Sequence, residues 1–327
     1  MSSSRLLGLW SSADADVGDA EAAIRRIRDR DPAGSLRNAV VSLVVLVDDA
    51  RDAITALGIG DALGVRVPSR VIVVSTGPGR PSGTKASVKV GLLDRGDAAP
   101  LCAEQVRLHV SGEAVDHLDL IVGPWILPGL PLAVWLPRRL PRPAEPVVAD
   151  AERVIVDSDR LGRPLDETEL AALRDPPTVD LVWVRLRPWR RLLADAFTGA
   201  DMSPFAPGVD RVDITGGLPW SVLLAGWLLS GLELSPSSIR LGEGDPPAVH
   251  LWAQDRGRRA EVTARRGDAR HVRVTTTVAG GAARQHLVRL PEDSLVADVE
   301  AALTAPAGHD ETWARAAAGA TVVLRHR

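Results

Sequence analysis

The sequence predicts an α/β (α+β) protein with two domains, an N-terminal α/β domain with a mixed sheet and a C-terminal domain of helices plus an antiparallel β-meander. Two observations predict these classes: strand and helix patterns alternate through the first half, and short alternating strands separated by turn residues fill the last third. The length of 327 residues suits two domains of ordinary size. We place them at residues 1–175 and 176–327.

The first elements follow a strand–helix–strand order. RLLGLW is expected to be a strand, and Asp14 or Asp16 is expected to cap the helix after it. NAVVSLVVLV, at residues 38–47, is a continuous β-branched run, which is typical of a strand buried on both faces. A helix over 48–63 and a strand over 70–74 follow, and then ASVKVGLLD and EQVRLHVSG, which alternate like half-exposed strands.

The remaining helices and strands of the N-terminal domain are expected to be short. Residues 118–126 are predicted to be helical, and 130–137 to be a short buried strand bounded by prolines. ERVIVDS has a strand pattern and DETELAAL a helical one. The RDPP segment then marks a loop, so the domain boundary is predicted near Asp175.

The C-terminal domain is expected to begin with helices and continue as a meander. Pro188 and Pro219 are each expected in the first turn of a helix, where the missing N–H costs nothing. IRLGEG, AVHLWAQ, AEVTARR, HVRVTTTV and QHLVRLP are predicted to be the antiparallel strands. Two further helices, over 295–303 and 312–324, are expected to cover one face of this sheet.

Composition indicates an ordinary globular protein of the cytoplasm. The chain is 45% hydrophobic and 25% charged, and its net charge of −3 indicates no general affinity for nucleic acid or an anionic membrane. Cys102 is the single cysteine, so an intramolecular disulfide is excluded, which suits a reducing compartment. The apolar stretch LLGLW is too short for a signal peptide, and the apolar segment 218–231 is too short to cross a bilayer. We therefore expect a cytoplasmic location.

Four tryptophan-bearing or apolar phrases stand out in a chain with nine tryptophans and no tyrosine. They are VPSRVIVV, GPWILPGLPLAVWLP, DLVWVRLRPWRRLLADAF and LLAGWLLSG. In this order and spacing they resemble the OpcA family of the actinobacterial type, known as glucose-6-phosphate dehydrogenase assembly proteins. The resemblance runs from about Leu6 to about Trp313. It implies a non-catalytic factor that binds glucose-6-phosphate dehydrogenase and promotes its oligomerisation or activity in the oxidative pentose phosphate pathway.

The strongest candidate for a ligand loop is VIVVSTGPGRPSGTKAS. Its third glycine, Gly83, arrives one place late for a dinucleotide fingerprint, and Thr84 separates it from Lys85 where a P-loop needs the pair adjacent. A solvated loop between strands is the favoured interpretation. An alternative function stays open, a nucleotide- or sugar-phosphate-binding enzyme or sensor that uses Arg70 and the Gly77–Gly83 loop.

Other catalytic and metal-binding patterns are missing from the sequence. The seven histidines lack H-x-x-x-H spacing, one cysteine makes no thiolate cluster, and no G-x-S-x-G nucleophile elbow occurs. We expect no catalytic residue, no cofactor and no metal.

Partner binding is expected where tryptophan and arginine alternate, because these residue types are enriched at interaction hot spots. Trp189, Leu193 and Phe197 also have the spacing of a helix's inward stripe, so Trp189 is expected in the core. Ser69 and Arg70 are expected to point outward at a sheet end, where α/β folds place binding sites. The candidate contact residues are Trp183, Arg185, Arg187, Trp189, Arg190, Ser69 and Arg70.

Overall fold

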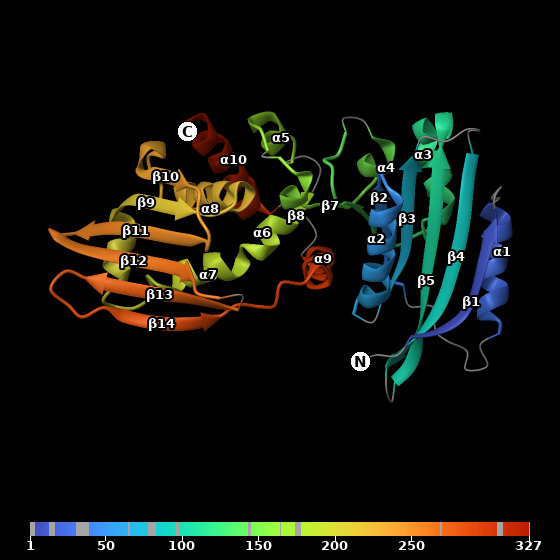
Figure 1. Cartoon of the computed structure of the whole chain (residues 1–327), viewed down its shortest axis with the longest axis horizontal. Helices are drawn as coiled ribbons and strands as arrows, with labels where there is room; N and C mark the ends of the chain where they lie inside the picture. Colours follow the sequence, from blue (N-terminus) through green and yellow to red (C-terminus); the bar gives the residue numbers. More distant parts are fainter. Residues whose placement is uncertain are drawn as a thin grey trace. The chain divides into compact units, whose positions relative to one another are not determined.

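The chain forms two compact units, each with its own sheet and helices (Figure 1). The computed structural model describes residues 4–12, 17–30, 39–64, 66–77, 83–95, 98–142, 145–163, 165–173, 178–268, 270–305 and 310–326. Unit 1 comprises Met1–Asp157 and Leu295–Ala307, and unit 2 comprises Ser158–Ser294 and Gly308–Arg327. The predicted α/β class is confirmed. The predicted boundary at Asp175 and the predicted caps Asp14 and Asp16 lie outside the described residues.

Unit 1 is built on a mixed sheet whose strands run in the order β1-β4-β5-β3-β2-β6-β7. β2 pairs in parallel with β3 and β6, whereas β4 pairs antiparallel with β1 and β5. All residues of β2 are buried, as its β-branched pattern predicts. The strands are β1 (Ser4–Ser12), β2 (Val41–Val47), β3 (Ser69–Gly77), β4 (Gly83–Arg95), β5 (Ala98–Ser111), β6 (Leu132–Leu136) and β7 (Arg153–Val156).

Helices cover both faces of this sheet. α1 (Val17–Arg28) lies against β1 and β4, and α2 (Ala50–Leu63) lies on the opposite face against β2, β3 and β5 (Figure 1). Asp49 begins α2, because its carboxylate accepts a hydrogen bond from the Asp52 N–H at 2.7 Å. Short helical turns complete the unit: η1 (Gly112–His117), α3 (Leu118–Val122), η2 (Gly123–Trp125) and α4 (Pro146–Ala149).

The helix α9 (Leu295–Thr304) belongs to unit 1, although the sequence pattern suggests a place over the C-terminal sheet. It lies against α2 and β7. Arg66 forms an ion pair with Glu300 at 2.6 Å, and Arg153 donates to the terminal carbonyl oxygens of Leu303 and Ala305, each at 2.7 Å. Arg153 thus satisfies acceptors that a helix end leaves open, and this fixes α9 in unit 1.

Unit 2 contains a six-stranded sheet in the order β10-β9-β11-β12-β13-β14. The predicted antiparallel meander is confirmed for β11 to β14. The prediction that IRLGEG belongs to this antiparallel meander is wrong, because β10 pairs in parallel with β9, a strand that was not predicted from the sequence. The strands are β9 (Val209–Thr215), β10 (Ile239–Gly242), β11 (Ala248–Asp255), β12 (Arg258–Arg266), β13 (His271–Val278) and β14 (Arg284–Arg289).

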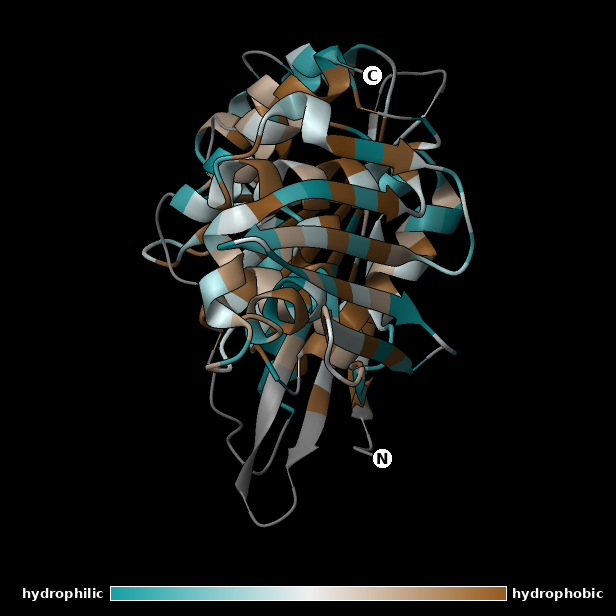
Figure 2. Ribbon diagram, turned by 90° about the vertical axis from the view of Figure 1, so that its left-hand side faces the viewer, coloured by the Kyte–Doolittle hydropathy of each residue, from teal (hydrophilic) through white to brown (hydrophobic). Residues whose placement is uncertain are grey.

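The helix α8 (Leu218–Gly231) connects β9 to β10, which supplies the crossover that a parallel pair requires. Along β11 and β12 the buried and more exposed residues alternate, and Figure 2 shows bands of alternating hydropathy on strands of the structure. α8 also contacts α10 (Glu311–Arg325) closely. The remaining elements are η3 (Ser158–Leu161), α5 (Glu167–Ala172), β8 (Thr178–Asp180), α6 (Leu181–Arg185), α7 (Arg187–Asp195), η4 (Ser203–Gly208) and η5 (Pro236–Ser238).

The positions of two helix-starting prolines agree with the prediction. Pro188 and Pro219 each occupy the first turn of their helix, α7 and α8, as predicted. No helix among the described residues has both the length and the apolar character needed to cross a bilayer.

Candidate functional site

The tryptophans of α6 and α7 form part of the core of unit 2. Trp183 is 4% exposed and Trp189 is 3% exposed. The predicted inward stripe of α7 is confirmed for Trp189 and Leu193, whereas Phe197, its third member, lies beyond the end of the helix and is of intermediate exposure. The Trp183 indole packs 5.6 Å from the ring of Trp313 and donates its Nε1–H to Asp310 Oδ2 at 3.3 Å. Trp189 meets Trp220 edge to face at 5.0 Å. Neither candidate tryptophan offers its ring to the surface.

Arg190 is held against this core. Its guanidinium carbon lies 3.4 Å from the centroid of the Trp183 ring, and Nη2 donates to the Trp183 carbonyl oxygen at 3.3 Å. Burial lowers the pKa of Arg190 to about 10, and the positive charge of Arg187 acts in the same direction, while Asp310 opposes both. The side chain therefore supports the Trp183 ring and presents little of its charge outward.

The other arginines of this segment differ in exposure. Arg187 is exposed at the start of α7, and Arg185 is of intermediate exposure at the end of α6. Arg191 is also exposed and lies 3.8 Å from Asp195, one turn along the helix. Of the predicted contact residues on these two helices, Arg187 is the most accessible.

Ser69 and Arg70 do not point outward, so that prediction is wrong. Ser69 is 5% exposed and Arg70 is 1% exposed, because β3 already begins at Ser69 and both residues belong to the buried part of this strand. Arg70 Nε and Nη2 donate to Glu104 Oε2 at 2.8 and 2.7 Å, and Nη1 donates to Glu21 Oε1 at 2.5 Å. A buried cation needs such partners, and these connect α1, β3 and β5.

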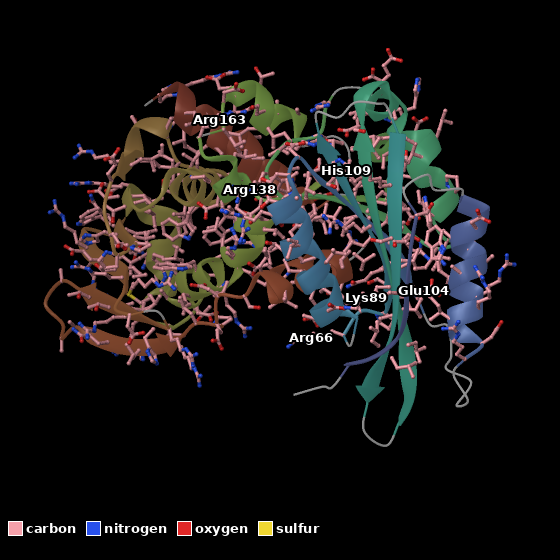
Figure 3. The ribbon with its side chains drawn as sticks, turned by 45° about the vertical axis from the view of Figure 1, so that its right-hand side comes forward. Arg66, Lys89, Glu104, His109, Arg138 and Arg163 are labelled. Carbon is pink, nitrogen blue, oxygen red and sulfur yellow. The ribbon has the colours of Figure 1, made fainter. Side chains whose placement is uncertain are left out.

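The two faces of β5 carry different polar groups (Figure 3). Glu104 faces Arg70 and α1, whereas Gln105 donates to Asp61 Oδ1 on α2 at 3.0 Å. Lys89 joins the α2 side through an ion pair with Asp61 at 2.8 Å. These groups neutralise one another within unit 1, and residues 78–82 of the Gly77–Gly83 loop lie outside the described residues.

The polar face of the six-stranded sheet was not among the sites predicted from the sequence. Trp252, of intermediate exposure, stacks on His250 with ring centroids 3.6 Å apart, and the Arg211 guanidinium lies 4.2 Å from the Trp252 centroid. His250 Nε2 lies 3.2 Å from Glu261 Oε2, and Arg211 pairs with Asp213 at 2.6 Å. The period of two in AVHLWAQ already places Trp252 opposite the apolar positions, so this signal was available.

Unit 2 also contains an open pocket of about 460 Å³. Its charged lining residues are Asp201, Asp255, Arg258 and Arg284, and Arg284 pairs with Asp201 at 2.7 Å. The two signs balance, so the pocket favours no class of charged ligand. Across the described ranges, no three His, Cys, Asp or Glu side chains are grouped to hold a metal ion.

Comparison with known proteins decides the family. Two family models for a glucose-6-phosphate dehydrogenase subunit match in succession, that of its N-terminal domain over residues 60–175 and that of its C-terminal domain over residues 176–317. This chain belongs to the OpcA family. The second match spans the whole six-stranded sheet, together with α6, α7 and α8.

Two curated relatives are cyanobacterial proteins of the same printed name, "Putative OxPP cycle protein OpcA". The relative from Nostoc punctiforme is 28% identical over 213 residues, which cover 60% of this chain and 45% of the relative. The relative from Synechocystis sp. is 26% identical over 198 residues, which cover 57% of this chain and 42% of the relative. The matched segments thus span less than half the length of either relative.

Proposed function

We propose that this OpcA-family chain is a non-catalytic partner of glucose-6-phosphate dehydrogenase that binds the enzyme and promotes its assembly or activity. The observation that carries the proposal is the succession of the two dehydrogenase-subunit domains over residues 60–317. The names of the relatives, which refer to the OxPP cycle, agree with a role in the oxidative pentose phosphate pathway. A cytoplasmic location forms part of the same proposal.

The contacts of Arg70 in the interior of unit 1 argue against the alternative function. In the alternative function Arg70 binds a phosphate, but its guanidinium already donates hydrogen bonds to Glu104 and Glu21. Releasing it to a ligand would break both of its hydrogen bonds to the buried Glu104 carboxylate, at a cost of several kcal/mol. No structural observation therefore favours a nucleotide or sugar-phosphate site at Arg70.

The direct test mixes the purified chain with the dehydrogenase of the same organism. We expect a stable complex by size-exclusion chromatography with light scattering, and higher dehydrogenase activity at limiting substrate. An activator achieves this by binding the active conformation more tightly than the inactive one. If no complex forms in micromolar mixtures, the proposal is wrong.

Arg187 is the contact that we propose on α7. Its replacement by alanine is expected to weaken binding by about 1–3 kcal/mol, the range for a desolvated interface arginine, and to leave the fold intact because the side chain is exposed. Arg191→Ala on the same helix is the matched control. Calorimetric titration measures both, and equal affinity of Arg187→Ala and the parent would show that α7 is not the interface.

A further inference from the structure

Two arginines stand opposite each other on the polar face of the six-stranded sheet. Arg265 of β12 is the register partner of Arg273 of β13, and Arg273 is in turn opposite Leu287 of β14. Their neighbours along the strands, Ala264 and Val272, are buried, so the arginines project from the other face, and both are exposed. Side chains that are directly opposite begin about 5 Å apart at Cβ.

Neither arginine has an acidic partner among the described residues. On β11, Ala248 is opposite Arg265, and the next outward pair along β12 and β13 is Thr263 with Thr275. Glu261 and Asp268, the carboxylates nearest to Arg265 in sequence, already have partners: Glu261 lies 3.2 Å from His250, and Asp268 lies 3.0 Å from His271. Further along the chain, Asp293 pairs with Arg266 at 2.9 Å and Glu292 with Arg270 at 3.0 Å. Like charges directly opposite on a sheet are destabilising, so the free chain carries an uncompensated repulsion here.

Protection of the sheet edge explains only part of this charge. Arginines on an edge strand hinder pairing with other molecules, which accounts for Arg284 and Arg289 on the edge strand β14. Arg265 and Arg273 lie on β12 and β13, which both have neighbours on each side, so this reason does not apply to them. Leu287 adds a 63% exposed apolar side chain to the same row.

We propose that Arg265, Arg273 and Leu287 form a docking site for an acidic segment of the partner protein, with an apolar side chain that contacts Leu287. This inference rests on the proposed function, so the partner is the dehydrogenase. A carboxylate between the two guanidinium groups would replace their repulsion by charge-assisted hydrogen bonds, which arginine forms in a bidentate manner. Because both arginines stand on interior strands, the backbone that carries them is ordered before the partner arrives, so binding has only the side chains to order.

The test compares stability and binding in the same variants of the full chain. In Arg273→Thr the new residue matches Thr275 and Thr277, the outward residues that follow it on β13. We expect the unfolding midpoint of the isolated variant to rise, because the repulsion is removed. The dissociation constant of its complex with the dehydrogenase should also rise, by tenfold or more when Arg265→Thr is combined with it. Replacing an arginine pair with a structural role alone would not raise the stability of the chain while lowering its affinity for the dehydrogenase.

Arg259→Thr is the control. Arg259 projects from the same face of the same strand as Arg265, six residues away, or about 20 Å. This variant should bind like the parent, and raising the salt concentration should weaken the parent complex more than that of the double variant. If Arg273→Thr folds poorly, Arg273→Gln serves for the same two measurements.

The outcomes separate the two proposals. If the parent forms no complex, both the function and this site are wrong. If the parent binds and the double variant binds within twofold of it, the site is wrong while the function stands. Equal weakening by Arg259→Thr would show a general effect of charge and would also overturn the site.

Discussion

At the scale of single residues, position in the sheet or helix decides what an arginine does. Arg187 and Arg190 are one turn apart on α7, yet the first is exposed and the second lies on the Trp183 ring. The sequence grouped both as contacts, because alternation of tryptophan and arginine does not reveal which guanidinium turns inward. The outward position predicted for Arg70 was also wrong, because its partners Glu21 and Glu104 are distant in sequence and could not be recognised from the residues around it.

Glu145 gives a residue-scale prediction for pH. Arg139 donates to Glu145 Oε2 at 2.9 Å and to Oε1 at 2.5 Å. Burial acts to raise the pKa of Glu145, but the hydrogen bonds and charges of Arg139 and Arg142 outweigh it and hold the pKa below its ordinary value of 4.5. A carboxylate with a depressed folded-state pKa stabilises the fold above its unfolded pKa, and this contribution is lost as the pH falls through the folded pKa.

The expected result concerns Glu145→Gln. Its free energy of unfolding should be lower than the parent's at pH 7, and the difference should shrink as the pH falls below about 4.5. Urea denaturation at pH 7 and at pH 4 or lower measures this for both chains. A difference that stays constant over that range would mean that the Arg139 ion pair does not depend on ionised Glu145.

At the scale of elements, α8 and α10 depend on glycine at their contact. A Cβ on Gly226 would lie 2.1 Å from the Ala316 carbonyl oxygen, and one on Gly319 would lie 2.4 Å from the Gly226 carbonyl oxygen. No side chain fits between the two backbones, so Gly226→Ala must push the helices apart. We expect a loss of about 3 kcal/mol in the free energy of unfolding.

Gly231→Ala is the control for this prediction, because a Cβ at the end of α8 meets nothing within 4 Å. It should leave stability nearly unchanged, since alanine also favours the helix. Thermal unfolding followed by circular dichroism compares the two variants. Equal midpoints for both would show that the helix contact is looser than these distances indicate.

Elements with strong local patterns were predictable, and those defined by distant pairing were not. The β-branched run of β2, the Asp49 cap of α2 and the prolines of α7 and α8 each act within a few residues. The parallel pairing of β10 with β9 depends on how α8 returns the chain, and the place of α9 depends on Arg66 and Arg153. For the candidate site, period-two alternation marks Trp252 as outward, but the Arg265–Arg273 pair requires the register of β12 with β13.

At the scale of the whole molecule, the proposed function makes binding and dehydrogenase activity two measures of one coupling. If this chain raises the enzyme's affinity for substrate or NADP by some factor, linkage requires that ligand to tighten the complex by the same factor. Titrating the chain into the dehydrogenase with and without saturating glucose 6-phosphate, and then NADP, measures that factor. For a tenfold activation through affinity, the dissociation constant should fall tenfold, which is about 1.4 kcal/mol.

If the complex forms equally well with and without both ligands while activity still rises, the chain acts on a catalytic step or on enzyme assembly. Assembly then predicts a dependence of activation on enzyme concentration, because the chain would shift an association equilibrium of the enzyme by mass action.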